Sequence, residues 1–208
     1  SYSLVAKSHY KSDSKKLSRE YFDKALADPE MLASKKALDY APFVREGVDS
    51  EIFGNDLLSL VGYYSERYAL LNDYYNKAGN RRASLVTALW MLEKRVKANP
   101  VKKVIKGNTY LASLDSLVAL YGDLKECGEV AIAKYDYMAD CQDVTPKQKV
   151  DYIMFAKQKW AAWKGINRLE RYYAEMVRPG FEMNVGNTYL PNREDTLSIE
   201  ARNLKYLT

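Results

Sequence analysis

"NDLLSLVGYYSERYALLNDYYNKAGNRRASLVTALWMLEKRVKANP", residues 55–100, decides the fold class of this 208-residue chain. Its apolar residues recur every three or four positions on both sides of Gly79-Asn80, which is the spacing of amphipathic helices. Glycine suits the C-terminus of one helix, and asparagine suits the N-cap of the next. We therefore expect a helix over 55–79 and a second over 81–98, folded back on each other as an antiparallel pair.

The same spacing predicts further helices on both sides of this pair. Towards the N-terminus we expect helices over 15–27 and, from the N-cap signal Asp28-Pro29, over 29–39, with 41–54 as a connection. Towards the C-terminus we expect helices over 109–121, 128–140 and 146–177. The last of these begins with Thr145-Pro146 and Gln148, the pattern of a capping box.

Taken together, these segments predict a mainly α protein built as an array of antiparallel helical hairpins. The pairs 55–79 with 81–98 and 109–123 with 128–140 resemble tetratricopeptide hairpins. The stretches "ALYGDLKECGEVAIAKY" and "YFDKALADP" share the small and aromatic positions of that repeat. The full consensus is absent and the period is irregular, so we expect an irregular array and not a regular repeat.

The periodicity changes after Pro179. Apolar residues alternate with polar ones at Phe181, Met183 and Val185 and again at Leu197, Ile199 and Ala201, which predicts two strands. Two strands alone are marginally stable. We therefore predict two domains, a helical-hairpin domain over 1–180 and, over 181–208, the truncated start of a β-sandwich. The strands should lie against the 146–177 helix or pair with a neighbouring chain through their edges.

Composition excludes several classes of protein. The chain is 47% hydrophobic and 28% charged, as in a soluble globular domain, and it has no apolar run of the roughly 18 residues that a membrane span needs. The net charge is only +5. The basic stretch "EKRVKANPVKKVIKGN" has no interleaved aromatic residue, so a solvated helix end explains it better than a nucleic-acid site. Its cations are Lys94, Arg95, Lys97, Lys102, Lys103 and Lys106.

No catalytic, cofactor-binding or metal-binding residue is predicted. His9 is the only histidine and lies in a polar N-terminal arm, where neither a catalytic triad nor a zinc site is expected. Cys127 and Cys141 bracket a predicted helix, which separates them by roughly 18–20 Å and predicts two free thiols. The acidic pairs Asp136 with Asp140 and Glu170 with Glu175 are expected on solvated helix faces.

Aromatic residues leave two interpretations open. Eighteen tyrosines suit either the packing between helices or a contact surface. Trp160 and Trp163 share a face with Ile153 and Ile166, which favours a place in the core over stacking on a sugar. A glycan-binding groove requires that Tyr64, Tyr68, Tyr75, Trp160 and Trp163 are exposed.

The C-terminal stretch "RPGFEMNVGNTYLPNREDTLSIEARNLKYLT" resembles the opening of a macroglobulin-type β domain in bacterial alpha-2-macroglobulins. Residues 197–202 match its first strand and Arg202-Asn203-Leu204 match its turn, although the chain ends before the Tyr-Arg pair of the next strand. "YFDKALADPEMLASKKALDYAPFV" and "DSEIFGNDLLSLVGYY" look like the helical region that precedes these β domains.

The resemblance implies a function but not a reaction. Members of this family trap proteases, many of them through a thioester in the motif Cys-x-Glu-Gln. Here the nearest match is "CGEV", Cys127 to Val130, and valine cannot supply the acyl group of a thioester. The implied function is a non-catalytic scaffold or interaction domain of an exported alpha-2-macroglobulin-like protein of the protease-inhibitor type.

The implied partners are proteins: other domains of the same full-length chain and, through them, proteases. No nucleic acid, no cofactor and no direct membrane span is expected. The implied location is the periplasm or the cell envelope, and a lipid anchor on the full-length protein is left open. The alternative is a tetratricopeptide-like module of the bacterial cell envelope that binds a peptide or a glycan. An enzyme built as a helical barrel is disfavoured because histidine is so scarce.

Overall fold

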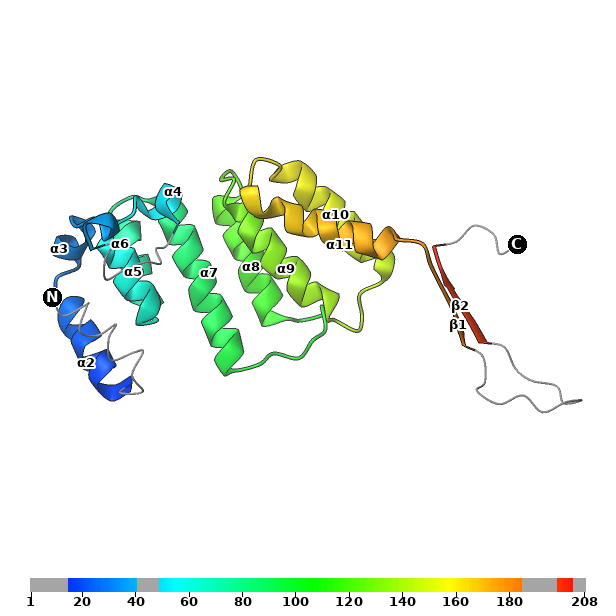
Figure 1. Cartoon of the computed structure of the whole chain (residues 1–208), viewed down its shortest axis with the longest axis horizontal. Helices are drawn as coiled ribbons and strands as arrows, with labels where there is room; N and C mark the ends of the chain where they lie inside the picture. Colours follow the sequence, from blue (N-terminus) through cyan, green and yellow to red (C-terminus); the bar gives the residue numbers. More distant parts are fainter. Residues whose placement is uncertain (1–14, 41–48, 185–197, 204–208) are drawn as a thin grey trace, which may run out of the picture.

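The computed structural model describes residues 15–40, 49–184 and 198–203. These residues form a mainly helical body that is followed by a two-stranded ribbon (Figure 1). The first helices are α2 (Lys15–Ala25), α3 (Pro29–Ala33), the 3-10 helix η1 (Ala37–Tyr40), α4 (Ser50–Phe53), α5 (Leu57–Tyr64), α6 (Tyr68–Lys77) and α7 (Arg81–Ala98). They are followed by α8 (Thr109–Tyr121), α9 (Cys127–Ala139), α10 (Pro146–Lys159), the 3-10 helix η2 (Lys164–Ile166), α11 (Asn167–Val177), β1 (Gly180–Asn184) and β2 (Ser198–Arg202).

The antiparallel pair at the centre of the sequence is confirmed. Gly79 has φ +70°, the left-handed conformation that a helix C-terminus requires and that glycine adopts without strain. The Asn80 side chain then accepts a hydrogen bond from the Ala83 amide at 3.1 Å and caps α7. Consequently α6 and α7 pack along each other, and α8 and α9 form a second pair of the same kind.

The predicted helix over 55–79 is wrong in one respect, because the structure divides it into α5 and α6. The Arg67 amide donates to the Gly62 carbonyl at 2.9 Å and the Glu66 amide to the Tyr63 carbonyl at 3.0 Å, which is a Schellman ending. Glu66 occupies its left-handed position, with φ +55°. Glycine usually fills that position, so the sequence contains no signal for the break.

The predicted helix over 146–177 is also divided, into α10 and α11 with η2 between them. Its start is confirmed, since Thr145 and Gln148 form the expected capping box. The break comes where two tryptophans turn inwards. The Trp160 indole N–H donates to the Gly122 carbonyl at 3.2 Å and the Trp163 indole N–H to the Glu129 carboxylate at 3.0 Å. Trp160 is the C-cap of α10 and Trp163 the N-cap of η2, so both contacts lie at the break.

The N-terminal predictions need smaller corrections. The predicted helix over 29–39 ends at Ala33, because the backbone of Lys35 and Ala37 pairs with residues 55–57 instead. The connection predicted over 41–54 contains the short helix α4, whose N-cap is Asp49. Residues 41–48 of that connection lie outside the described residues.

The helices from α7 onward pack around a shared core. Each helix packs against the next one in the chain: α7 on α8, α8 on α9, α9 on α10 and α10 on α11. The core is one apolar cluster, and its most buried members include Leu58, Leu71, Leu114, Ile153 and Leu169, each 0% exposed. The face predicted for Ile153, Trp160, Trp163 and Ile166 is also buried, even though the helix that carries it is not continuous.

The two predicted strands are confirmed as an antiparallel ribbon. Phe181 pairs with Ala201 and Met183 pairs with Ile199. The ribbon extends beyond the end of α11 and does not lie along α10 or α11, contrary to one of the expected arrangements (Figure 1). Its base is held by Asn203, whose side-chain amide donates to the Met176 carbonyl at 2.7 Å and so caps α11.

Candidate functional site

One face of the ribbon is apolar throughout its described length. Residues opposite each other in an antiparallel ribbon share a face, as do alternate residues along a strand. The two cross-strand pairs therefore place Phe181, Met183, Ile199 and Ala201 together. Phe181 is 53% exposed, Met183 51% and Ile199 45%. Exposed apolar side chains gathered in this way mark a contact surface.

The other face of the ribbon does not stabilise it. Glu182 lies directly opposite Glu200, and like charges in this arrangement are destabilising. In the described part of the chain the sheet has only two strands, so both outer edges have free backbone groups. A ribbon of this kind is marginally stable without packing on one face.

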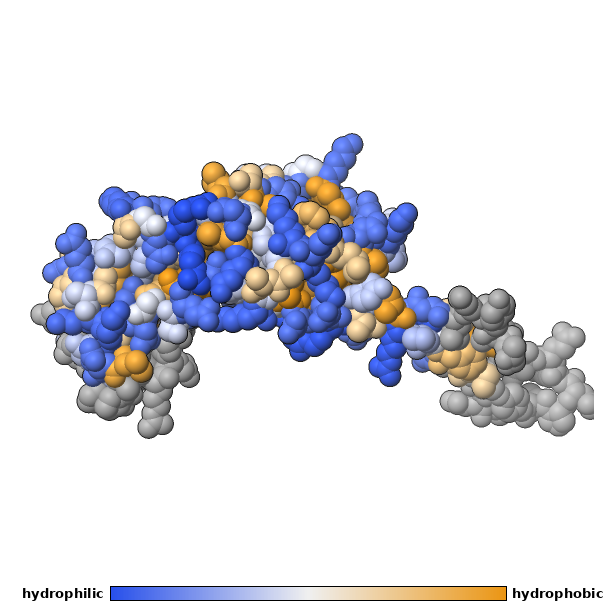
Figure 2. Space-filling view, turned by 90° about the horizontal axis from the view of Figure 1, so that it is seen from above, coloured by the Kyte–Doolittle hydropathy of each residue, from blue (hydrophilic) through white to orange (hydrophobic). Residues whose placement is uncertain are grey.

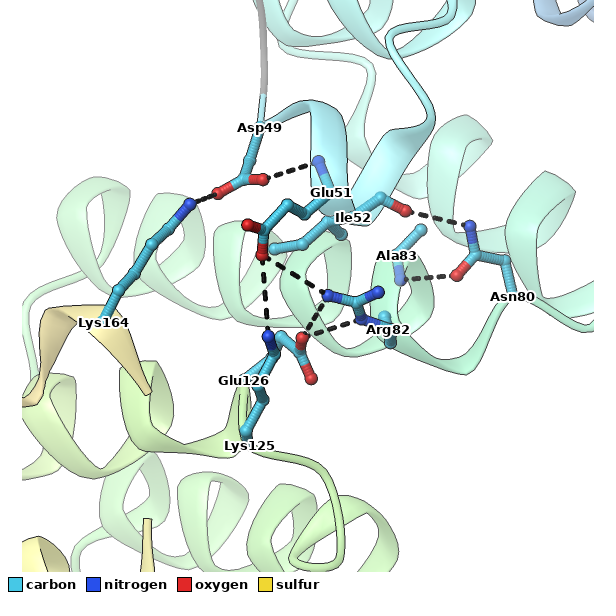
Figure 3. A network of polar contacts seen from close by, with 9 residues as sticks. All are labelled: Asp49, Glu51, Ile52, Asn80, Arg82, Ala83, Lys125, Glu126 and Lys164. Carbon is cyan, nitrogen blue, oxygen red and sulfur yellow. Dashed lines mark hydrogen bonds and ion pairs between the residues drawn. The ribbon is translucent and has the colours of Figure 1, made fainter. Parts of the chain in front are cut away.

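A polar network joins the N-terminal helices to the rest of the array (Figure 3). At its centre is Glu126, which is 1% exposed and accepts a hydrogen bond from Arg82 Nε at 2.7 Å. The Nη2 atom of Arg82 lies 2.5 Å from the same carboxylate oxygen and completes the ion pair. Glu51 of α4 lies 3.6 Å from the Lys125 ammonium group. Lys164 of η2 pairs with Asp49 at the start of α4. These contacts fix α4 against α7, α9 and η2.

A cavity of about 310 Å³ opens between α7 and α9. Glu93 of α7, Tyr110 of α8, and Asp136 and Tyr137 of α9 line it. Tyr110 is 6% exposed, and its ring lies edge-on to the ring of Tyr137 at 4.9 Å. Desolvation raises the pKa of Glu93, and the charges of Glu129 and Asp136 raise it further. This cavity combines carboxylates with aromatic rings.

Two more hollows lie elsewhere on the body. One, of about 440 Å³, lies between α2, the turn from α5 to α6, and α7, and Arg19, Phe22, Tyr64 and Lys94 are among its lining residues. The other, of about 470 Å³, lies between α8 and α10 over α9, and Leu111, Asp115, Lys134 and Tyr152 are among its lining residues. Hydrophilic residues cover most of the body between small apolar patches in Figure 2. The array therefore has several concave surfaces.

The exposure of five aromatic residues tests the hypothesis of a glycan-binding groove. Tyr75, Trp160 and Trp163 are 3%, 3% and 7% exposed, and they belong to the core. Tyr64 and Tyr68 are partly exposed. The core interpretation of the two tryptophans is confirmed, and a groove of five exposed rings is not formed.

The cysteines, the basic stretch and the acidic pairs have ordinary structural surroundings. Cys127 and Cys141 are free, as predicted, and both are buried. Burial raises the pKa of the Cys127 thiol to about 11. In the basic stretch, Lys94 pairs with Glu66 and Lys103 pairs with Asp140. Of the acidic residues, Asp136 pairs with Arg168 at 2.8 Å and Glu170 with Lys157 at 2.7 Å. His9 lies outside the described residues.

The stretch that most nearly matches a thioester motif serves packing. Cys127 and Val130 are both 0% exposed in α9. A Cβ atom on Gly128 would lie 2.7 Å from the Trp163 ring, so glycine is needed for the indole to approach. Glu129 accepts the hydrogen bond of that indole. In this stretch, Gly128 leaves room for the Trp163 ring and Glu129 binds its indole N–H, so the stretch packs α9 against Trp163.

Sequence reasoning missed the most buried charge and the cavity between α7 and α9. Arg82 and Glu126 are 44 residues apart and belong to different predicted helices, so no local pattern pairs them. Glu93 was included in the basic stretch, where its neighbours are lysines and arginine. The sequence offers one signal for the cavity, which is that Tyr110 lies in the first turn of a predicted helix. In the structure its ring contacts the ring of Tyr137.

Within the described ranges, no helix has the length and apolar composition needed to cross a bilayer. Those residues also bring together no group of three His, Cys, Asp or Glu side chains that could hold a metal ion. Comparison of the chain with protein-family models, with curated proteins and with solved structures gave no match. The assignment of function therefore depends on the surfaces described above.

Proposed function

We propose that this chain is the non-catalytic helical scaffold domain of an exported alpha-2-macroglobulin-like protein, and that it docks on a following β domain. The observation that carries the proposal is the ribbon, whose apolar face of Phe181, Met183, Ile199 and Ala201 is exposed. A second β layer packed about 10 Å away would bury that face. The sequence resemblance of residues 178–208 to a macroglobulin-type β domain points to the same partner.

The helical body suits the scaffold role because it is braced from end to end. The Arg82–Glu126 pair and the Lys164–Asp49 pair connect helices that are distant in sequence. At its C-terminal end, Asn203 links the ribbon to α11. A rigid array with an anchored ribbon can hold a β domain in a fixed orientation. In this proposal the full-length protein acts in the periplasm or the cell envelope.

Site-specific photo-crosslinking tests the proposal. A photoreactive amino acid replaces Met183 on the apolar face of the ribbon in the protein expressed from its full reading frame. The matched control carries it at Glu182, on the opposite face. We expect Met183 to crosslink within the same polypeptide, to a β segment that follows residue 208, and we expect Glu182 to do so far less. Crosslinks only to lipid or to α10 and α11 would contradict the proposal, as would equal crosslinking from both positions.

A second candidate is a peptide-binding module of the cell envelope. The cavity between α7 and α9 favours it, because such a hollow at the meeting of three helices can receive a side chain. The reading frame separates the two candidates. Repeated β domains after residue 208 support the first, and a stop codon soon after it supports the second.

A further inference from the structure

The cavity between α7 and α9 contains a hydroxyl group that has no partner in the described part of the chain. Tyr110 is 6% exposed, yet no residue within 15–40, 49–184 and 198–203 forms a hydrogen bond with its hydroxyl. No fully enclosed side-chain N or O atom in those ranges lacks a partner, so this hydroxyl is not sealed in the core but reaches the cavity. Buried tyrosines usually pair their hydroxyl groups. This one is available to a ligand.

Carboxylate oxygens face the same cavity. Glu93 has no hydrogen bond or ion pair within the described residues. Asp136 uses Oδ2 to accept from Arg168 at 2.8 Å, and its other oxygen keeps its capacity to accept. The cavity therefore offers acceptors from α7 and α9 around the free hydroxyl of α8.

The charges around the cavity favour a cation. The carboxylates of Glu93, Glu129, Asp136 and Asp140 outnumber the cations Lys97, Lys103 and Arg168. Lys103 is neutralised by Asp140 and Arg168 by Asp136, which leaves Lys97, an exposed side chain, to oppose a bound cation. Desolvation raises the pKa of Glu93, with Glu129 and Asp136 adding to the shift, as a negative local field predicts. A bound cation would relieve that repulsion.

We propose that this cavity binds the arginine side chain of a basic peptide segment in a partner protein. A guanidinium group is planar and has five N–H donors, which match the Tyr110 hydroxyl and the Glu93 and Asp136 carboxylates. It also stacks on tyrosine rings, and the half-buried Tyr137 lines this cavity. A volume of about 310 Å³ is at the lower limit of ligand pockets and suits one side chain. The proposal depends on the array being an interaction scaffold and is independent of the ribbon.

Isothermal titration with three short peptides tests it. The peptides are acetyl-Gly-Arg-Gly-amide, the same peptide with citrulline, which keeps the shape of arginine but is neutral, and the same peptide with lysine. The protein is the 208-residue chain and its variants Glu93→Gln and Tyr110→Phe, with Glu175→Gln as a control that removes an exposed charge from α11. The thermal midpoint of each variant shows that it is folded.

We expect the arginine peptide to bind and the citrulline peptide to bind at least tenfold more weakly. Glu93→Gln should weaken the binding of arginine about tenfold, and Tyr110→Phe about fivefold, because each removes one hydrogen-bonding group from a charged ligand. Glu175→Gln should have no effect. The proposal is overturned if arginine does not bind, if citrulline or lysine binds equally well, or if Glu93→Gln behaves like the control. Such a failure would leave the crosslinking test of the ribbon unaffected.

Discussion

At the scale of single residues, the pair formed by Arg82 and Glu126 is the most demanding interaction in the fold. Glu126 is 1% exposed, whereas the Arg82 side chain is 36% exposed. A buried carboxylate that loses its partner keeps the full cost of desolvation, but an arginine at this level of exposure can turn to water. The two partners are therefore not equivalent, and removing each one should have a different effect.

The substitution Arg82→Met should lower the free energy of unfolding by about 3 kcal/mol, and Glu126→Gln by about 1 kcal/mol, because only the first leaves a buried charge unpaired. Urea unfolding measures both. The matched control is Arg81→Met, since Arg81 pairs with Asp123 at a site where both side chains are more than half exposed, and we expect it to cost less than about 1 kcal/mol. Equal effects of Arg82→Met and Arg81→Met would show that Glu126 is not held by this pair.

Glu93 gives the fold a pH dependence of its own. Its pKa in the folded protein is raised, so the unfolded chain loses this proton at lower pH than the folded chain does. Below the pKa of the unfolded chain, Glu93 is protonated in both states and does not change the free energy of unfolding. As the pH rises through the window between the two pKa values it destabilises the fold, and the cost is complete at neutral pH.

Glu93→Gln removes this cost. The variant should be more stable than the original chain at pH 7, by about 0.5 kcal/mol, the size of an exposed charge interaction. The difference should disappear near pH 4. Urea midpoints at the two pH values measure it. A variant that is less stable at pH 7 than the original would mean that Glu93 has a favourable partner in the fold.

At the scale of elements, the sequence predicts which residues face inwards better than where helices end. Ile153, Trp160, Trp163 and Ile166 are all buried as their spacing predicts, although they lie on both sides of the break between α10 and η2. The same apolar spacing fits a straight helix and a divided one, and the distant partners of the two indoles at the break are not visible in the local sequence. Where a break has a local cause, as at Gly79-Asn80, the sequence predicts it.

Gly128 tests how tightly α9 packs on the turn between α10 and α11. A Cβ atom there would lie 2.7–2.8 Å from atoms of Trp163, whose indole is fixed by its hydrogen bond to Glu129. Gly128→Ala should cost about 1–3 kcal/mol through overpacking, less the roughly 1 kcal/mol that alanine contributes to a helix. Thermal unfolding and tryptophan emission measure the effect. An unchanged midpoint and an unchanged emission maximum would contradict the packing described for Trp163.

The candidate sites were less predictable than the fold. The alternation from Phe181 to Ala201 predicted the strands of the ribbon, because a period of two is visible in the residues themselves. The cavity between α7 and α9 combines Glu93, Tyr110 and Asp136 from three helices. Their meeting depends on the order in which the helices pack, which no local pattern specifies.

At the scale of the whole molecule, a helical body with a buried core is joined to a ribbon that has no buried side chain among its described residues. The body is stabilised by one continuous apolar cluster. The ribbon has its own backbone pairing and the Asn203 contacts to α11, but its apolar face is uncovered. Hydrogen exchange should differ between these parts, because exchange follows the free energy of local opening.

Hydrogen exchange of the ribbon amides, followed by mass spectrometry, tests the central claim that a β layer covers the ribbon. In the 208-residue chain, peptides covering 180–184 and 198–202 should exchange within seconds, while peptides from α7 to α11 stay protected. In the protein expressed from its full reading frame, the ribbon peptides should become as protected as those helices. Ribbon amides that exchange equally fast in both forms would contradict the claim.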